Sequence, residues 1–167
     1  MSSKIKFCKP KKSQTKEIIK LVKDTKILDV NSEYLYYLQT IHFNKFCCVA
    51  VDENKKDKVI GFVSGYLIPD ENSLFIWQVA VNEKYRGLGL AQRMILNIAN
   101  RKAMKKINFI KTTVSPSNQS SIRVFEKVAN ELNTKIKKHK FLKMKDFTNS
   151  HEDEPMYVIG TINKKDK

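Results

Sequence analysis

The strongest constraint on the fold lies between residues 73 and 106, where an apolar run, a glycine-containing turn and an amphipathic segment follow one another. The run SLFIWQVAV is apolar at both alternating sets of positions, which is typical of a strand covered on both faces. In the segment GLAQRMILNIANRKAMKK, apolar residues recur at helical spacing. The expected buried face holds Ala91, Met94, Ile95, Ile98 and Ala99. We therefore predict a buried strand that turns sharply into a helix at Gly87 and Gly89.

The rest of the chain alternates between helical and strand-like patterns, without an internal repeat or a linker. Expected strands are IKFCKP, FCCVAV, VIGFVSGYLI, INFIKTTV and MYVIGTI, and expected helices are SQTKEIIKLVKDT, NSEYLYYLQTIHF and a third that starts at residues 115–117. The stretch between the third of these helices and the last strand is less regular. Short polar turns around residues 59–68 favour antiparallel neighbours. The pattern predicts one α+β domain over residues 1–167, with a mixed, mostly antiparallel central sheet flanked by helices.

Two of the expected helices carry an apolar stripe with aromatic residues in it or beside it. In residues 31–43, Leu35, Leu38 and Ile41 or His42 recur along one side, with Tyr34 and Tyr37 beside them. In the last helix, Phe125 lies in register with Ile122, Val128 and Leu132. We expect both stripes to face the core.

The formal charge of +15, from 32 basic and 17 acidic residues, invites a nucleic-acid reading. The lysines are scattered through turns and tails without a recognised nucleic-acid motif, so a non-catalytic basic binding module ranks below the other hypotheses. A basic surface equally attracts small polyanions. Cys8, Cys47 and Cys48 lack metal-ligand spacing, and no apolar stretch is long enough for a signal peptide or a membrane span. We expect a cytoplasmic, metal-free protein with no membrane partner.

The turn RGLGLA has the chemistry of an anion site. Backbone N–H groups converge at the start of a helix, Arg86 adds a positive charge, and Gly87 and Gly89 allow close approach to the backbone. A Walker loop is excluded because no Lys-Ser or Lys-Thr pair follows the last glycine. A dinucleotide fingerprint is excluded because Gln92 occupies the place of its third glycine.

The same turn fits the pattern Arg/Gln-x-x-Gly-x-Gly/Ala, and in this respect the chain resembles the GCN5-related N-acetyltransferases. The order of elements along nearly the whole chain is also similar to that family. The resemblance implies that the turn holds the pyrophosphate of acetyl-CoA and that the preceding strand binds the pantetheine arm. The cofactor residues that it implies are Val79, Val81, Arg86, Gly87, Leu88, Gly89, Leu90, Ala91 and Asn118.

One position departs from the family pattern. Many relatives carry a tyrosine seven residues after the asparagine, where it can protonate the departing thiolate, but this chain has Phe125. Phenylalanine cannot donate a proton, so we expect Phe125 to be a core residue. The general acid is then Tyr34, Tyr37 or water, or the reaction needs none, because a thiolate is a good leaving group.

A local reversal of charge points to the substrate. Glu152, Asp153 and Glu154 form an acidic run within a basic tail, and Asp29 precedes a tyrosine-bearing helix. Carboxylates and the face of Trp77 would suit a small cationic substrate.

A narrower resemblance rests on five stretches taken together: LDVNSEYLYYL, FIWQVAV, RGLGLA, TTVSPSN and HEDE. Over residues 28–159 they resemble the L-2,4-diaminobutyrate N-acetyltransferases, a family of the ectoine pathway that acetylates the 4-amino group. The resemblance implies that Asp29, Tyr34, Trp77 and Glu154 surround the substrate, with Glu152 as a neighbour. Another small amine, such as a polyamine or an amino acid, is the alternative substrate. A homodimer is compatible with these patterns.

The chemistry assigns further roles. An alkyl ammonium with a pKa near 10 must lose its proton before it attacks the thioester. We expect Glu154 to take that proton, directly or through water, and Asp29 to anchor an ammonium group. Attack is expected to be direct, in a ternary complex, because Cys47 and Cys48 have no evident base and are expected to be buried thiols. Structural roles are expected for His42, packed on its helix, for His139 on the surface and for His151 in the acidic loop.

Overall fold

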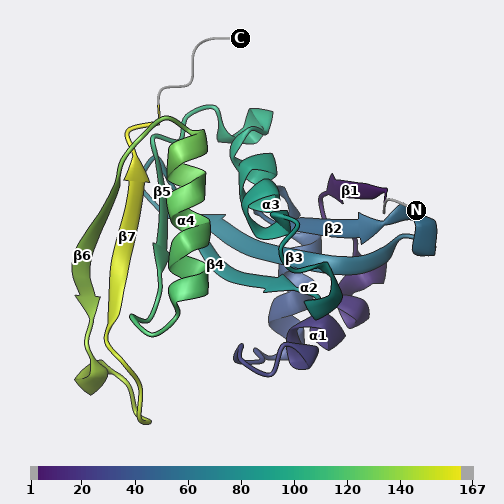
Figure 1. The fold of residues 1–167 in the computed structure, drawn as a ribbon, viewed down its shortest axis with the longest axis horizontal. Coiled ribbons are helices and arrows are strands. Elements are labelled where there is room, and N and C mark those ends of the chain that lie inside the picture. The colour runs from purple at the N-terminus through teal and green to yellow at the C-terminus, as the bar shows by residue number, and fades with distance from the viewer. Residues whose placement is uncertain (1–3, 163–167) are drawn as a thin grey trace. The chain divides into compact units, whose positions relative to one another are not determined.

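The computed structural model describes residues 4–162 (Figure 1). They form a seven-stranded sheet with the hydrogen-bonded order β1-β2-β3-β4-β5-β7-β6. The strands are β1 (Ile5–Cys8), β2 (Cys48–Asp52), β3 (Lys58–Leu67), β4 (Ser73–Val81), β5 (Phe109–Thr113), β6 (Ile136–Leu142) and β7 (Glu154–Gly160). The α-helices in this part of the chain are α1 (Thr15–Asp24), α2 (Glu33–Ile41), α3 (Leu90–Ala99) and α4 (Gln119–Glu131).

The strand directions confirm the expected α+β class with a mixed, mostly antiparallel sheet. The pairs β1–β2, β2–β3, β5–β7 and β6–β7 are antiparallel, whereas β4 and β5 are parallel. The described residues divide into two compact units: unit 1 (residues 4–66 and 76–104) and unit 2 (residues 67–75 and 105–162). One domain over residues 1–167 stays a prediction, and residues 1–3 and 163–167 lie outside the described part.

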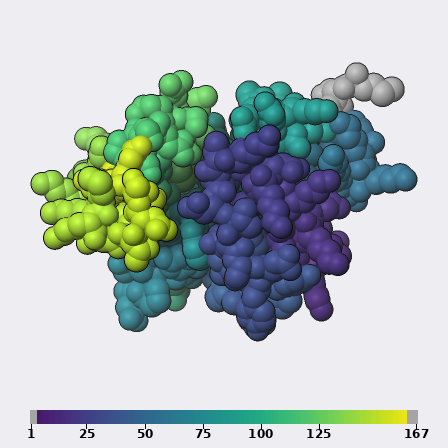
Figure 2. Space-filling model, turned by 90° about the horizontal axis from the view of Figure 1, so that it is seen from below, coloured from purple at the N-terminus to yellow at the C-terminus, as the bar shows by residue number. Residues whose placement is uncertain are grey.

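Unit 1 has helices on both faces of its strands (Figure 1). Val49 and Val51 of β2 join a buried cluster with apolar residues of α1 and with Tyr36 of α2. On the opposite face, the Cys48 thiol lies 3.6 Å from the side-chain oxygen of Asn97 in α3. The alternation of β2 side chains therefore creates two apolar layers. In the space-filling view, α1 and α2 (purple to blue) pack into one continuous surface (Figure 2).

Strand β4 has the predicted bounds, but the prediction that both its faces are covered is wrong. Leu74, Ile76 and Ala80 are buried, whereas the alternate side is partly open and Trp77 is 49% exposed. An aromatic or apolar residue can occupy an open strand face as easily as a buried one, so composition alone did not separate the two.

The prediction for α2 is also wrong about which side is buried. Tyr36, Gln39 and Thr40 face the interior, whereas Leu35 and Leu38 are half-buried and Ile41 is 44% exposed. Polar partners account for this choice: the Thr40 hydroxyl lies 2.8 Å from that of Thr15 in α1. The Ser32 side chain accepts a hydrogen bond from the Leu35 N–H and caps the helix, which lies within the predicted segment of residues 31–43.

Helix α3 is shorter than predicted. It ends at Ala99, and a 3-10 turn (Lys102–Met104) takes up part of the remaining segment. Arg101 lies outside the helix, and its guanidinium donates to the carbonyls of Asn44, Lys45 and Cys47. The last turn of α3 therefore holds no basic residue.

Unit 2 contains a strand that the sequence pattern did not reveal. β6 pairs with β7 at the edge of the sheet, and α4 packs against both strands. The side chains from Lys137 to Phe141 are exposed, so no apolar alternation marked the strand. A lysine-rich sequence is typical of an edge strand, because charge opposes pairing with another sheet. No helix within residues 4–162 combines the length and apolar character needed to cross a membrane.

The start of α4 also differs from the expected position. Asn118, and not one of residues 115–117, caps the helix: its side-chain oxygen accepts from the Ser121 N–H at 3.1 Å. Phe125, one of the expected core residues of this helix, is 2% exposed, which confirms that prediction.

Replacement of Phe125 by Leu tests this packing. We expect the change to lower the free energy of unfolding by roughly 1–3 kcal/mol, because it removes part of a buried ring and leaves a cavity. Urea denaturation followed by circular dichroism measures the loss. Lys127→Ala, on the exposed side of the same helix, is the control and should change stability by less than about 0.5 kcal/mol. Equal stability of the Leu variant and the native chain would contradict the assignment of Phe125 to the core.

Candidate functional site

The glycine turn of unit 1 has the geometry of an anion-binding loop. Gly87 has φ +80° and Gly89 has φ +68°, which is the left-handed region that favours glycine. A Cβ atom built at either position would meet nothing within 4 Å, so the space beside the backbone is open. Gly89 is also the N-cap of α3, and the first N–H groups of a helix have no acceptor within it. The loop therefore fits a bound pyrophosphate group.

A buried contact holds the segment that leads into this loop. The Tyr85 hydroxyl donates to the carboxylate of Asp52 at 2.7 Å, and Lys55 donates to the same hydroxyl at 2.8 Å. Asp52 is fully buried at the end of β2. Because Tyr85 directly precedes Arg86, the contact fixes where the loop begins. This pair was not predicted from the sequence, where its signal is an acidic residue next to an apolar run.

Predicted cofactor residues come together at the end of β4. Val81 and Arg86 both line a surface cavity of about 150 Å³ in unit 1. Arg86 and Leu88 are exposed, Val79 and Ala91 are half-buried, and Leu90 is buried in the core. Leu90 therefore offers a ligand its backbone, and not its side chain. A positive side chain, an accessible strand face and free helix N–H groups are thus grouped at one end of α3.

The predicted substrate residues of unit 1 are accessible to solvent. Asp29 is exposed in the loop before α2, Tyr34 in the first turn of α2 is 73% exposed, and Trp77 is 49% exposed. The backbone of Asp29 is tied to β4, since its carbonyl accepts a hydrogen bond of 2.8 Å from the side-chain amide of Gln78. Neither Gln78 nor Tyr36, which contacts it, was predicted from the sequence to support the site. The available signal was Gln78, a polar residue within the apolar run from Leu74 to Val81.

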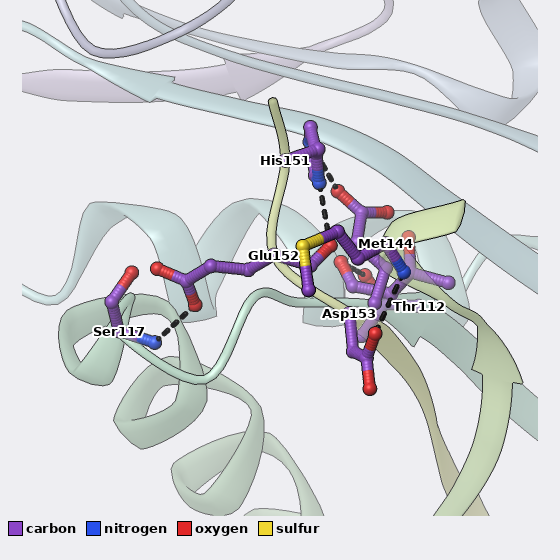
Figure 3. Close-up of polar contacts among 8 residues, drawn as sticks. Thr112, Ser117, Met144, His151, Glu152 and Asp153 are labelled. Atoms are coloured by element: carbon purple, nitrogen blue, oxygen red, sulfur yellow. Dashed lines mark hydrogen bonds and ion pairs between the residues drawn. The ribbon is translucent and has the colours of Figure 1, made fainter. Parts of the chain in front are cut away.

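The acidic segment lies in unit 2, where its carboxylates have different partners (Figure 3). Glu152 accepts a hydrogen bond of 3.0 Å from the Ser117 N–H, and Asp153 accepts one of 2.7 Å from the Met144 N–H. Hydrogen bonds from Ser117 lower the pKa of the Glu152 carboxyl. A carboxylate with a lowered pKa is a weaker base, so Glu152 is better suited to holding the chain than to taking a proton.

Glu154 is placed differently from its two neighbours. It is the first residue of β7, which begins two residues before the predicted strand, and it is paired with Leu142 of β6. One of its carboxylate oxygens lies 3.4 Å from Nε2 of His151. The ring of His151 stacks on Phe147 at 4.0 Å, and its Nδ1 lies 2.7 Å from the Glu152 carbonyl. His151 therefore orders the acidic segment, as expected. Glu154 is the carboxylate of the segment that faces a titratable side chain.

The remaining predicted side chains have mostly structural positions. Asn118 lies in unit 2, where its side-chain oxygen caps α4. Burial raises the pKa of the Cys47 and Cys48 thiols to about 12, so both stay protonated near neutral pH. This confirms that they are buried thiols and argues against an acetyl-cysteine intermediate. His139 is exposed, as expected, but His42 is exposed as well and does not pack on its helix.

Comparisons with known proteins agree with this geometry. A model of the acetyltransferase (GNAT) family matches residues 15–129. The chain is 41% identical to L-2,4-diaminobutyric acid acetyltransferase of Methylotuvimicrobium alcaliphilum over 146 residues, which cover 86% of this chain and 83% of the relative. It is 37% identical to the protein of that name from Virgibacillus pantothenticus over 157 residues, which cover 93% and 97% of the two chains.

Solved structures show the same likeness. The diaminobutyrate acetyltransferase of Paenibacillus lautus, determined in complex with L-2,4-diaminobutyric acid and coenzyme A, has a TM-score of 0.90 and 34% identity and covers 99% of this chain and 100% of its own. The NatC complex bound to Gag peptide and CoA has a TM-score of 0.76 at 18% identity, which shows a shared fold alone. Since the family model spans more than half of the sequence and the curated relatives cover most of it, the chain belongs to the acetyltransferase (GNAT) family.

Proposed function

We propose that this chain transfers the acetyl group of acetyl-CoA to the 4-amino group of L-2,4-diaminobutyrate, the reaction that its resemblance places in ectoine biosynthesis. The observation that carries the proposal is the likeness to the Paenibacillus lautus enzyme, whose structure contains this diamino acid and coenzyme A. Two relatives named L-2,4-diaminobutyric acid acetyltransferase are 37% and 41% identical to this chain over most of its length. The glycine loop and the accessible carboxylates of this chain have the chemistry that such substrates require.

The loop at residues 86–91 would hold acetyl-CoA, which supplies the acetyl thioester. Its glycines leave room for a pyrophosphate beside the backbone, and the exposed Arg86 adds a positive charge. Val79 and Val81 lie on the partly open face of β4, where backbone and side chains can pack along a pantetheine arm. Asn118 is proposed as a further contact through the part of its side chain that capping does not use.

The amine must be neutral to attack. At pH 7 an alkyl amine with a pKa near 10 is about one part in a thousand neutral, which costs roughly 4 kcal/mol. We assign Glu154 as the group that takes the proton, directly or through water. Glu152 and Asp153 already accept hydrogen bonds from backbone N–H groups, whereas the contact of Glu154 is with His151. A carboxylate beside an imidazole can pass a proton onward.

The second amino group needs an anchor. Asp29 is exposed and its loop is tied to β4, so we assign it to an ammonium group of the substrate. Trp77 presents half of its surface and can make a cation–π contact. Tyr34 is proposed as a substrate contact and as a donor for the leaving thiolate, a role that the buried Phe125 cannot fill.

The choice of amine is tested with a panel of substrates. We expect clear preference for 2,4-diaminobutyrate over ornithine and lysine, because an added methylene misplaces the reactive nitrogen and such errors can cost about a hundredfold in rate. Release of coenzyme A thiol measures each rate, and proton NMR of the product shows whether the carbon bearing the 4-amino group shifts downfield. Acetylation at the 2-amino group, or equal turnover of lysine or a polyamine, would refute the substrate assignment.

The cofactor loop is tested by Gly89→Val. The added side chain meets no protein atom near its Cβ but would occupy the space proposed for the pyrophosphate, so KM for acetyl-CoA should rise. Backbone strain is controlled by Asn133→Val, since Asn133 also has a positive φ, of 49°, and lies at the end of α4. Circular dichroism checks that both variants fold. An unchanged KM for acetyl-CoA in a folded Gly89 variant would exclude the loop as the pyrophosphate site.

The carboxylates are tested by paired acid-to-amide changes. Glu154→Gln should lower kcat by about a hundredfold or more, as loss of a general base does. Asp29→Asn should instead raise KM for the diamino acid by about tenfold, because a charged hydrogen bond is lost. Asp153→Asn is the matched control, since an amide oxygen can still accept the hydrogen bond from the Met144 N–H. Full activity of the Glu154 variant would show that Glu154 is not the base.

The rate of the native chain should climb from neutral to mildly alkaline pH, because a larger fraction of the amine is then neutral.

A further inference from the structure

We propose that Gln78 and Tyr36 are positioning residues that hold the Asp29 loop against β4 and thereby determine the affinity for the amine substrate. The inference rests on the proposed function, in which Asp29 anchors an ammonium group. Neither residue is expected to touch the substrate, because Gln78 is 7% exposed and Tyr36 is fully buried.

Two hydrogen bonds join these residues to the loop, and a third joins the two side chains to each other. The Gln78 amide donates to the Asp29 carbonyl at 2.8 Å, and its oxygen accepts from the Tyr36 hydroxyl at 3.1 Å. The same hydroxyl accepts from the Asn31 N–H at 3.4 Å. The backbone groups on both sides of Val30 are therefore fixed by one buried chain of polar side chains.

The backbone at Asp29 and Asn31 depends on these hydrogen bonds, because the neighbouring side chains give it little packing. Ile27 is 75% exposed and Val30 is 45% exposed, so neither packs firmly. Leu28 is partly buried against the core cluster, and its N–H donates to the Thr25 hydroxyl at 3.4 Å. These contacts hold the first half of the loop, whereas the Asp29 and Asn31 backbone relies on Gln78 and Tyr36.

Through Gln78, the Asp29 loop is bonded to the same strand whose opposite face is partly open. Successive side chains of a strand point to opposite faces, so Gln78 points inward while Trp77 and Val79 point to the accessible side. One strand thus carries the proposed aromatic contact for the substrate and the amide that holds its proposed anchor. A buried glutamine is costly unless both its ends are hydrogen-bonded, and here both are. A binding loop held in place before the ligand arrives loses less entropy on binding.

The test compares isosteric changes on the buried side of α2. Tyr36→Phe removes the shared hydroxyl but keeps the ring that packs on Phe62. Thr40→Val removes a different buried hydroxyl of the same helix, which is bonded to Thr15 and takes no part in the hydrogen bonds to the loop. Gln78→Met removes both bonds of the amide. Steady-state kinetics on 2,4-diaminobutyrate and acetyl-CoA, thermal melting, and hydrogen–deuterium exchange of the peptide that contains Asn31 are measured for each variant.

We expect Tyr36→Phe and Gln78→Met to raise KM for the diamino acid by about tenfold, since buried backbone groups lose their partners. KM for acetyl-CoA should stay unchanged, and the Asn31 peptide should exchange faster. Thr40→Val should lower the melting temperature but leave both KM values and the exchange of this peptide unchanged.

Two results would overturn the inference: unchanged exchange and KM in Tyr36→Phe, or an equal rise of KM in Thr40→Val, which would indicate general destabilisation. Failure of the proposed function is separate. If the native chain does not acetylate 2,4-diaminobutyrate, the exchange measurement alone still decides whether Gln78 and Tyr36 hold the loop.

Discussion

Strand β4 exposes alternate side chains to two different environments, and the proposed chemistry of unit 1 depends on that alternation. Ile76 and Ala80 face the interior, and Gln78 between them holds the Asp29 loop through its amide. Trp77 and Val79 face the accessible side, where a pantetheine arm and a cationic substrate would lie. Because the two sets belong to one backbone, a shift of the strand by one residue would exchange core and site completely.

The acidic segment of unit 2 shows how neighbouring carboxylates acquire separate roles. Glu152 and Asp153 accept hydrogen bonds from backbone N–H groups, which tie the segment to the turn before α4 and to the chain after β6. The hydrogen bonds from Ser117 also lower the pKa of the Glu152 carboxyl. Glu154 begins β7 and contacts His151 instead. In a chain with a formal charge of +15, such a segment offers a cation a local site of the opposite sign. Geometry, rather than composition, distinguishes the proposed base from the structural acids.

Much of the fold was predictable because its signals are local. The bounds of β4, the buried cysteines and the core position of Phe125 follow from apolar runs. Strand β6 was not predictable from such patterns, since an exposed edge strand has no buried face to impose alternation. The buried side of α2 was not predictable either, because Tyr36 and Thr40 are buried for their distant polar partners Gln78 and Thr15.

The sequence by itself determined the family and the position of the glycine turn, since a strand, Arg86, two glycines and a helix lie within one short stretch and need no distant contact to be recognised. Only the tertiary structure decided which residues support that chemistry. Asp52 fixes Tyr85 beside the loop, and Gln78 fixes the backbone of Asp29, across 33 and 49 positions of the chain respectively. Such pairs leave no periodic pattern, because a hydrogen bond between distant residues is set by how the elements pack and not by their spacing in sequence.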